Sequence, residues 1–582
     1  MRVLNYKLIV VVALVFLGGC VVSPKQAAIK NEVVPSESQT KAAEQPESSP
    51  VETAIDPDVM YMLLVAEIAG QRERYDIALE GYLEAAKRVK DERLAERAAK
   101  IALFIRDAEK TDAAVALWLK DDPNNLTARK IALLSAFRRE AMQAAVDHAK
   151  FLLDKDPEDF ETTIVELVKA LGAKGDITFV YDVLDEVAAQ RPDQAVVYFV
   201  QSMLAMQLNS QVLAREKVKT ALAIRPDWDE ALLFQAQVAA YSGDLVEARA
   251  LLTDLAEKQP DNIKVKKLLA QVLIKSSDYE AAQALYTELL EKNPEDDESR
   301  FAMALIYLQL QQDEKAVPLF KALLEKPGWQ DQASFYLGRI AVREGRPDEG
   351  LVWFDKVTGG AFRFDASVAA ISLLIKENKF DEALSRLQNL PSKTEEQRMR
   401  TVLVKTEWYN GQKQYDKAFA LLSDALETMP KEKDLLYARA LVAERIDRLD
   451  VLESDLKRIL AENPDDVSAL NALGYTLVDR TRRYDEAQKY LDKALSLEPD
   501  EAVIIDSYGW LQYKLNNLDA ALEYLQRAYS LQQENEIAGH LLEVLWRLER
   551  KDEARELFDR VIKDAPDDEY LLDIQRRIFN AE

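Results

Sequence analysis

Apolar residues recur along most of this chain with the spacing of an α-helix. From Asp58 to the C-terminus, an alanine is repeatedly followed by a bulky residue four positions later and an apolar residue seven positions later. These spacings place the three side chains on one face of a helix. The alanine allows two helices to approach closely, and the larger residues fill the space beside it. Examples are Ala282-Tyr286-Leu289, Ala316-Phe320-Leu323, Ala487-Leu491-Ala494, Ala521-Leu525-Ala528 and Ala554-Phe558-Val561.

Proline marks the end of the repeating unit. It lacks an amide donor and disfavours helix in the residue before it, so it ends the second helix of a pair. The 443 residues from Pro123 to Pro566 hold thirteen periods of about 34 residues, and two less regular units precede them. A period near 34 is typical of stacked helix-turn-helix units. The pattern therefore predicts about fifteen repeats over residues 58–566. The marker prolines are Pro123, Pro157, Pro192, Pro226, Pro260, Pro294, Pro327, Pro430, Pro464, Pro499 and Pro566.

Pairs of aspartates follow some of these prolines. Free amides and the helix dipole favour negative charge at the start of a helix, so the pairs suit the cap and first turn of the next helix. The same residues could be paired catalytic carboxylates or calcium ligands, but the spacing of a calcium-binding loop is absent. Their recurrence at the repeat junction favours capping. The pairs are Asp296-Asp297, Asp465-Asp466 and Asp567-Asp568.

Two motifs give the repeats a family resemblance. Leu473-Gly474-Tyr475 and Tyr508-Gly509-Trp510 lie in neighbouring first helices and resemble the tetratricopeptide repeat family. The resemblance covers about 90 per cent of the chain. It implies an all-α solenoid in which stacked helix pairs form a superhelix. Residues 567–582 are expected to form a closing helix that covers the last repeat.

Some repeats depart from the family pattern. Val180 and Leu452 stand where the alanine of the second helix belongs. The departing units are expected to be distorted or to serve as bends, and they lie near residues 91–123, 161–192 and 431–464.

Aromatic residues recur in the predicted first helices. By resemblance to the family, particular first-helix positions face the groove of the superhelix, where aromatic side chains can anchor a protein partner. The alternative is that these side chains pack between adjacent first helices, an interpretation that is stronger for the phenylalanines than for the other residues. The candidates for the protein-binding groove are Phe199, Phe234, Phe301, Phe335, Tyr475, Trp510, Tyr513 and Trp546.

Residues 1–19 have the pattern of a secretory signal. Arg2 and Lys7 precede an apolar stretch that is too short to be a permanent membrane span. The Leu17-Gly18-Gly19-Cys20 sequence then resembles the lipobox of bacterial lipoproteins, which implies a covalent lipid on Cys20. An ordinary cleaved signal with an incidental cysteine remains the alternative. Val21, in place of aspartate, resembles lipoproteins that are sorted to the outer membrane.

Residues 20–57 contain several prolines, serines and glutamates and have no apolar periodicity, so we expect a flexible tether after the lipidated cysteine. The whole chain has a net charge of −26. Such a surface repels phosphate backbones and anionic headgroups, so nucleic acid is not an expected partner. The acyl chains alone are expected to hold the protein at the membrane, where it would face the periplasm.

The residues that enzymes use are scarce in this chain. Cys20 is the only cysteine, which excludes intramolecular disulfides and cysteine-based metal sites. His148 and His540 are the only histidines, and each is interpreted as packed or solvated. Neither a phosphate-binding glycine loop nor a G-x-S-x-G elbow is present. We therefore expect a protein without catalytic residues, metal or cofactor other than the lipid.

The C-terminal repeats also resemble a narrower group. The runs that begin at Asn471, Asp506 and Glu536 are similar to large outer-membrane lipoproteins built from such repeats. The resemblance implies an adaptor for a periplasmic carboxyl-terminal processing protease, which it would activate and supply with peptidoglycan-hydrolase substrates. The alternatives are an assembly factor for an envelope machine (a secretin, a pilus or the outer-membrane protein insertion complex), a scaffold for polysaccharide export, or an enzyme whose site has no recognisable motif. Whether the array forms oligomers is open.

Overall fold

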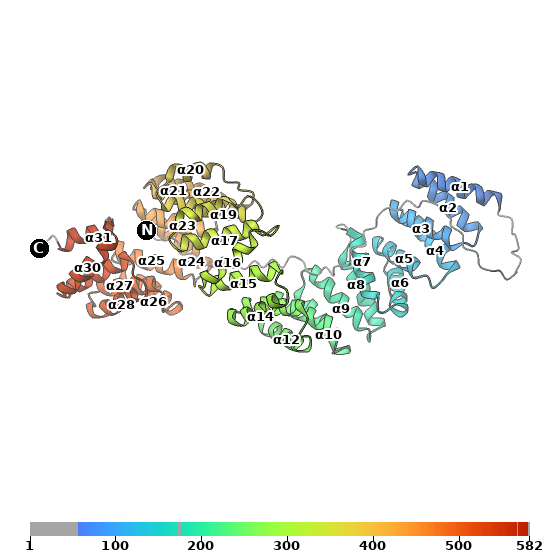
Figure 1. Cartoon of the computed structure of the whole chain (residues 1–582), viewed down its shortest axis with the longest axis horizontal. Helices are drawn as coiled ribbons and strands as arrows, with labels where there is room; N and C mark the ends of the chain where they lie inside the picture. Colours follow the sequence, from blue (N-terminus) through green and yellow to red (C-terminus); the bar gives the residue numbers. More distant parts are fainter. Residues whose placement is uncertain (1–55, 173–175, 567, 580–582) are drawn as a thin grey trace. The chain divides into compact units, whose positions relative to one another are not determined.

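The structure is a computed structural model that describes residues 56–172, 176–566 and 568–579. The predicted signal peptide, the lipid-attachment residue Cys20 and nearly all of the predicted tether lie outside the described residues. Within the described ranges every element is helical (Figure 1). Thirty of the described helices form fifteen consecutive pairs, which confirms the all-α repeat fold and the number of repeats. None of the described helices combines the length and apolar character that a membrane span requires.

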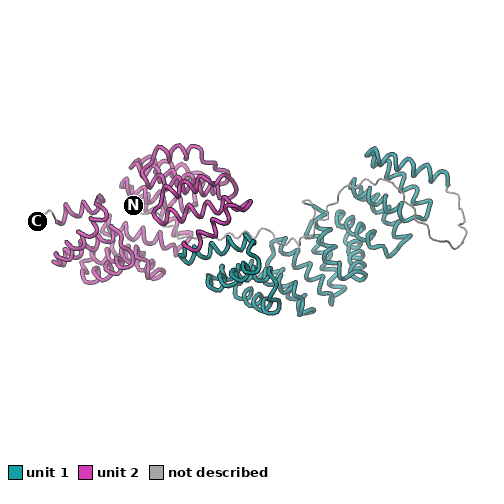
Figure 2. The backbone as a smooth tube through the Cα atoms, viewed as in Figure 1, with its two compact units in different colours: residues 1–312 teal, residues 313–582 magenta. Residues whose placement is uncertain are grey.

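The chain divides into two compact units, residues 1–312 and 313–582 (Figure 2). The described helices of unit 1 are α1 (Pro57–Gln71), α2 (Tyr75–Arg88), α3 (Glu92–Ile105), α4 (Ala108–Asp121), α5 (Leu126–Arg138), α6 (Met142–Lys155), α7 (Phe160–Leu171), α8 (Ile177–Gln190), α9 (Ala195–Gln207), α10 (Gln211–Ile224), α11 (Asp229–Tyr241), α12 (Leu245–Lys258), α13 (Ile263–Lys275), α14 (Tyr279–Lys292) and α15 (Asp297–Gln309).

Unit 2 continues the same alternation of first and second helices. Its described helices are α16 (Asp313–Leu323), α17 (Gln330–Arg343), α18 (Pro347–Asp355), α19 (Phe362–Lys376), α20 (Phe380–Gln388), α21 (Glu395–Gly411), α22 (Tyr415–Thr428), α23 (Lys433–Arg445), α24 (Leu449–Glu462), α25 (Val467–Arg480), α26 (Tyr484–Leu497), α27 (Ala502–Lys514), α28 (Leu518–Leu531), α29 (Asn535–Arg547), α30 (Lys551–Asp564), α31 (Glu569–Ile574) and the π-helix η2 (Gln575–Phe579).

The odd-numbered helices are the first helices of the pairs, and within each unit several of them contact one another. In unit 1, α3 contacts α5, α5 contacts α7 and α7 contacts α9; in unit 2, α25 contacts α27 and α27 contacts α29. First helices that touch their counterparts in the next repeat form a continuous layer, as expected for a stacked helical array. Side chains from adjacent first helices can therefore meet one period apart.

The predicted alanines of the second helices are at the centre of the packing. Ala282, Ala316, Ala487, Ala521 and Ala554 are all fully buried. The bulky residues four positions later are buried as well, which confirms that the pattern marks one helical face. These residues are Tyr286, Phe320, Leu491, Leu525 and Phe558.

The acidic caps predicted after the prolines are present where the structure describes them. Asp296 accepts a hydrogen bond from the Ser299 amide, and Asp466 accepts one from the Ala469 amide. Asp568 caps α31 by accepting from two amides of its first turn. Asp567 lies outside the described residues. The predicted capping role is thus confirmed for Asp296, Asp466 and Asp568.

The departing repeats still form helix pairs. Val180 in α8 and Leu452 in α24 are both buried at the position usually held by alanine. The larger irregularity is in helix length, and it lies between Pro327 and Pro430, where the 34-residue spacing of the prolines is interrupted. In this region α18 and α20 have nine residues each, whereas α22 has fourteen. The chain after α18 turns through Gly360, which adopts a positive φ of 65°.

Candidate functional site

Two of the aromatic residues predicted for the groove are buried between first helices of unit 1. Phe199 of α9 and Phe234 of α11 are 4% and 6% exposed, and their rings meet edge to face at a centroid distance of 5.6 Å. Phe199 also contacts the Trp228 ring at 4.6 Å. The two phenylalanines therefore join adjacent repeats, and little of either ring is accessible to a partner. Phe301 of α15 is half-buried.

Phe335 of α17 is half-buried within an aromatic group of unit 2. Its ring lies 5.3 Å from Phe362 and 6.1 Å from Phe354. The Arg339 guanidinium lies 5.8 Å from the Phe335 ring centroid. Phe335 thus packs within its own unit and keeps part of its surface exposed.

The last four candidates gather on three consecutive first helices. Tyr475 is on α25, Trp510 and Tyr513 are on α27, and Trp546 is on α29. Trp510 is 4% exposed, and its ring stacks against Tyr513 at 4.7 Å and against His540 at 4.2 Å. Stacking of this kind holds the first-helix layer together across repeats.

The edges of this aromatic group keep polar contacts. The Trp510 indole Nε1 donates to Asp479 Oδ1 at 3.1 Å, and the Lys514 ammonium lies 4.5 Å above the Trp510 ring. Trp546 is half-buried, with Phe579 at 5.0 Å on one side and the Lys551 ammonium 4.9 Å from its ring. Burial, followed by the Glu543 charge, raises the pKa of Tyr513.

A histidine that the sequence pattern did not connect with these residues lies at the centre of the group. His540 of α29 is 1% exposed, and its Nδ1 is 2.9 Å and 3.0 Å from the two Asp506 carboxylate oxygens. Its Nε2 is 3.4 Å from the Tyr475 hydroxyl, which in turn donates to Glu536 Oε1 at 3.2 Å. The four polar side chains tie together α25, α27 and α29.

Burial and charge act in opposite directions on the His540 imidazole. Burial alone lowers the pKa of His540, but the charge of Asp506 and the hydrogen bond to it outweigh burial and raise the pKa above 6.5. Burial also raises the pKa of Tyr475 well above its usual value, and the Glu536 charge adds to this effect. A neutral tyrosine is therefore available to donate to Glu536.

These contacts define what the cluster can do chemically. Both imidazole nitrogens of His540 are already engaged, one by Asp506 and the other by Tyr475. Held by these contacts in a buried setting, His540 links α25, α27 and α29. The other histidine, His148, is half-buried beside Arg129, and burial followed by the Arg129 charge lowers its pKa.

The spacing of the cluster was visible in the sequence as one repeat period. Asp506 precedes His540 by 34 residues, which places the two at the same position of adjacent first helices. Glu536 precedes His540 by four residues and so shares its helical face. The pattern within a single repeat does not reveal the pair, because Asp506 and His540 belong to different repeats.

Carboxylates surround this cluster on the first helices of unit 2. Burial raises the pKa of Glu444 on α23, and the nearby Asp479 and Glu536 charges raise it further, against a lowering effect of Arg445 and Arg480. Burial also raises the pKa of Glu407 on α21. Carboxylates and arginines therefore lie together on the first helices of unit 2.

Unit 1 offers a different surface on its first helix. The helix α1 buries Val59, Ala66 and Ala69 against its neighbour. On another face it exposes four large apolar residues, which we call the α1 stripe: Met60, Tyr61, Leu64 and Ile68, at 56%, 70%, 61% and 44% exposure. Terminal repeats of a solenoid normally have a polar outer face, so this row of apolar residues is a candidate protein-interaction surface.

The described residues contain no group of three or more His, Cys, Asp or Glu side chains placed to hold a metal ion. The candidate surfaces are therefore a polar aromatic cluster in unit 2 and the α1 stripe in unit 1. Together with the stacked helix pairs, these surfaces define a solenoid of the protein-binding scaffold class.

Comparisons with known proteins agree with this class. Profiles of the tetratricopeptide repeat match residues 267–332, 467–501 and 509–569. The TPR repeat-containing protein PA4667 of Pseudomonas aeruginosa is 36% identical over 523 residues, which covers 85% of each chain. This chain therefore belongs to the tetratricopeptide-repeat protein family. Repeats of this family generally form non-catalytic scaffolds that bind other proteins.

Solved structures of repeat proteins are also similar. TTC0263, a thermophilic TPR protein of Thermus thermophilus, is 23% identical, covers 31% of this chain and 97% of its own, and superposes with a TM-score of 0.29. The APC/C hetero-tetramer Cut9-Hcn1 is 13% identical, with coverage of 84% and 96% and a TM-score of 0.35. These TM-scores are too low for a superposition of whole chains.

Proposed function

We propose that this chain is a lipid-anchored adaptor that binds a periplasmic carboxyl-terminal processing protease, promotes its activity and presents cell-wall hydrolases to it. The sequence order of signal, Cys20, proline-rich tether and repeat array supports an outer-membrane lipoprotein that faces the periplasm. The lipid would then determine where binding occurs, and the array would determine which proteins are bound.

The α1 stripe is the observation that carries the proposal. It lies on the first helix of the array, directly after the proposed tether, and it exposes more large apolar residues than any other described helix. An apolar surface suits a long-lived partner, because stable interfaces are more hydrophobic than transient ones. We assign the protease to this stripe.

Substrates must dissociate from the adaptor, so they require a surface that binds them more weakly than the protease is bound. The carboxylates around Glu444, Asp479 and Glu536 in unit 2 suit weaker, polar contacts with cationic segments of a substrate. An adaptor that holds protease and substrate on one chain replaces a dilute encounter with a high effective concentration. The rate of cleavage would then rise without any catalytic residue in the adaptor.

Copurification from solubilised envelopes, with mass spectrometry, tests the proposal. We expect the protease and its hydrolase substrates to be recovered with the wild-type chain. The Leu64→Glu variant places a charge in the α1 stripe and should weaken protease binding by about 2 kcal/mol or more, roughly thirtyfold. Val212 of α10 is 84% exposed and stands outside the stripe, so Val212→Glu is the matched control and should leave binding unchanged.

The same experiment separates the alternatives. Repeated recovery of secretin, pilus or outer-membrane insertion components without a protease would replace the adaptor with an assembly factor. Recovery of polysaccharide-export proteins would indicate an export scaffold. Equal loss of protease with the Leu64→Glu and Val212→Glu variants would remove the assignment of the protease to the α1 stripe.

A further inference from the structure

The two ends of the described repeat array differ in how they are covered. At the C-terminal end, α31 packs on the last repeat and buries Leu571 and Ile574 completely. At the N-terminal end, α1 packs against α2, and no described helix precedes it (Figure 1). The α1 stripe therefore stays uncovered within the described residues. An exposed apolar face at the end of a solenoid is normally covered by a cap or by another chain.

Most of the α1 stripe lies on a single ridge of the helix. Met60, Leu64 and Ile68 follow one another at intervals of four residues, a spacing that aligns side chains in one row along a helix. Leu64 is the centre of this row, with one apolar residue four positions before it and one four positions after it. Two copies of such a row can pack antiparallel about a twofold axis at Leu64, with Met60 beside the partner's Ile68. The row is therefore complementary to itself.

The same row ends in two charged residues of opposite sign. Asp56 lies eight residues before Leu64, and Arg72 lies eight residues after it. Both are exposed, and within the described residues neither forms an ion pair. Asp56 Oδ1 accepts from the Asp58 amide at 3.0 Å, which leaves its second carboxylate oxygen available. In the antiparallel arrangement each Asp56 meets the partner's Arg72, so the charges are complementary at both ends of the row.

The other charged residues of α1 are already paired within the chain. Asp58 is 3.3 Å from Arg88 of α2, and Glu67 pairs with Arg97 of α3. These ion pairs hold α1 against the helices that follow it. The two charges at the ends of the row make no such contact, which leaves them for a partner of the opposite charge pattern.

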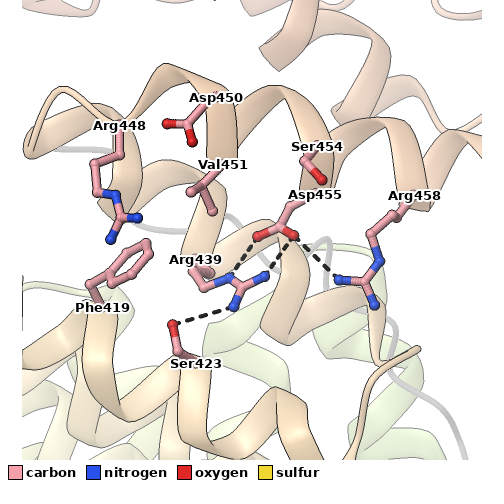
Figure 3. A pocket seen from close by; sticks show the side chains of 9 residues that line it. All are labelled: Phe419, Ser423, Arg439, Arg448, Asp450, Val451, Ser454, Asp455 and Arg458. Atoms are coloured by element: carbon pink, nitrogen blue, oxygen red, sulfur yellow. Dashed lines mark hydrogen bonds and ion pairs between the residues drawn. The ribbon is translucent and has the colours of Figure 1, made fainter.

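Unit 2 shows the usual arrangement, in which charges between helices are paired inside the chain. Arg439 of α23 donates to both oxygens of Asp455 of α24, at 2.7 Å and 2.8 Å (Figure 3). Arg458 makes a longer contact of 3.5 Å with the same carboxylate. Asp455 is 1% exposed, so this pairing stabilises a buried charge and offers nothing to another chain. The ends of the α1 row differ in being exposed and unpaired.

We propose that the α1 stripe is covered by the α1 stripe of a second copy of this chain, in an antiparallel twofold dimer. The dimer covers Met60, Leu64 and Ile68 of both copies and forms two ion pairs between Asp56 and the partner's Arg72. One helix from each copy makes an interface smaller than the standard size of roughly 1,600 Å². We therefore expect a weak dimer, with a dissociation constant in the micromolar range.

The dimer and the proposed protease complex use the same surface. On the proposed lipid anchor, copies share a thin layer at one membrane, which raises their effective concentration and favours a weak dimer. A copy becomes available to the protease only when the dimer dissociates. The dimer thus protects the apolar stripe until the protease is present, and this consequence rests on the proposed function.

Sedimentation velocity over a micromolar concentration series tests the dimer with no protease present. The sample is the mature chain, residues 20–582, with Cys20→Ser so that no acyl chain causes association. We expect a monomer–dimer equilibrium. Leu64→Glu puts two carboxylates beside the twofold axis and should weaken association by about thirtyfold or more. Val212→Glu changes an exposed apolar residue of α10 outside the stripe, so it is the matched control and should associate as the wild type does.

The ion pairs have a test of their own. Arg72→Glu and Asp56→Lys each place like charges at both ends of the row, and each variant alone should associate about tenfold more weakly. When the two variants are mixed, a dimer of one copy of each again has opposite charges at both ends. We expect the mixture to recover association, which a purely structural effect of either substitution would not produce. Circular dichroism checks that each variant folds.

Four results would each overturn the proposed dimer. They are a monomer at every concentration, wild-type association of Leu64→Glu, an equal effect of Val212→Glu, and a mixture that associates no better than its two components. None of these measurements involves the protease. Failure of the dimer therefore leaves the proposed function to be decided by copurification, and failure of copurification leaves the dimer to be decided by sedimentation.

Discussion

The residues that hold the C-terminal repeats together are polar as well as apolar. His540, Asp506, Tyr475 and Glu536 form a buried chain of hydrogen bonds that crosses three first helices. A buried charge that keeps its partner is tolerated, whereas one that loses its partner costs several kcal/mol. The stability of unit 2 should therefore depend on the protonation of a single imidazole.

The pH dependence follows from the raised pKa of His540. A group whose pKa is higher in the folded than in the unfolded chain contributes stability below its unfolded value and loses it as pH rises. The stabilisation should be complete below 6.5, the ordinary value, and should decline as pH rises through the folded pKa of His540. Urea unfolding of unit 2 at a series of pH values above and below 6.5 measures this decline.

Asp506→Asn should cost about 3 kcal/mol at low pH and should abolish the decline, because the histidine loses its counter-charge. Asp519→Asn, at an exposed position in the first turn of α28, is the control. It should lose at most about 1 kcal/mol of helix-dipole stabilisation and should leave the pH dependence around 6.5 unchanged. An unchanged pH profile in Asp506→Asn would contradict the role of this pair.

Residue-level predictions from the sequence succeeded where the cause is local. The caps at Asp296 and Asp466 depend on amides within three residues, so the sequence around each is sufficient. The burial of Phe199 and Phe234 depends on the adjacent repeat and could not be settled within one helix. Cys20 lies outside the described residues, and its lipidation stays a prediction.

At the scale of elements, the glycine of the family motif allows the two helices of a pair to pack closely. A Cβ on Gly474 of α25 would lie 2.6 Å from Leu491 Cγ of α26, well inside contact distance. The absence of a side chain at position 474 therefore allows α25 and α26 to pack closely. The position of this glycine within a helix would not by itself indicate that role.

Gly474→Ala should destabilise unit 2 by roughly 1–2 kcal/mol, because overpacking outweighs the better helix propensity of alanine. Gly70 of α1 is the control: its nearest neighbour, Ala78 Cβ, would be 4.0 Å from an added Cβ. Gly70→Ala should be neutral or stabilise by up to about 1 kcal/mol. Chemical denaturation of both variants provides the comparison, and a stabilised Gly474→Ala protein would show that the helices can separate without cost.

Most elements were predictable from period and proline, but their turns and lengths were not. The turns inside the pairs place residues such as Glu140 and Gln311 at φ values of 53° and 56°, a left-handed conformation usually given to glycine. The backbone path between two packed helices imposes this conformation. The residue type at the turn therefore does not predict it. The nine-residue α18 and α20 were also unforeseen, because no proline in phase marks their ends.

At the scale of the whole molecule, each repeat depends mainly on its neighbours. Stability in such an array is close to a sum of repeat and nearest-neighbour contributions, so a local change should remain local. Native-state hydrogen exchange of the Gly474→Ala variant tests this property. Amides of α25, α26 and α27 should exchange faster, and those of α2 to α6 in unit 1 should keep their rates. A uniform rise over both units would indicate one cooperative structure.

The bond between His540 and Asp506 has a consequence for how this array can change over evolutionary time. Removal of the 34 residues 506–539 would put His540 in the place of Asp506. The counterpart of Asp506 in the preceding first helix is Asn471, since Gly474 and Gly509 of the shared motif are 35 residues apart, and an asparagine has no carboxylate. Repeats that meet through apolar side chains can be gained or lost with little penalty, since the neighbours of the missing unit present similar surfaces to each other. The C-terminal repeats cannot be exchanged in this way, because His540 keeps its carboxylate partner only when these repeats stay in their present order.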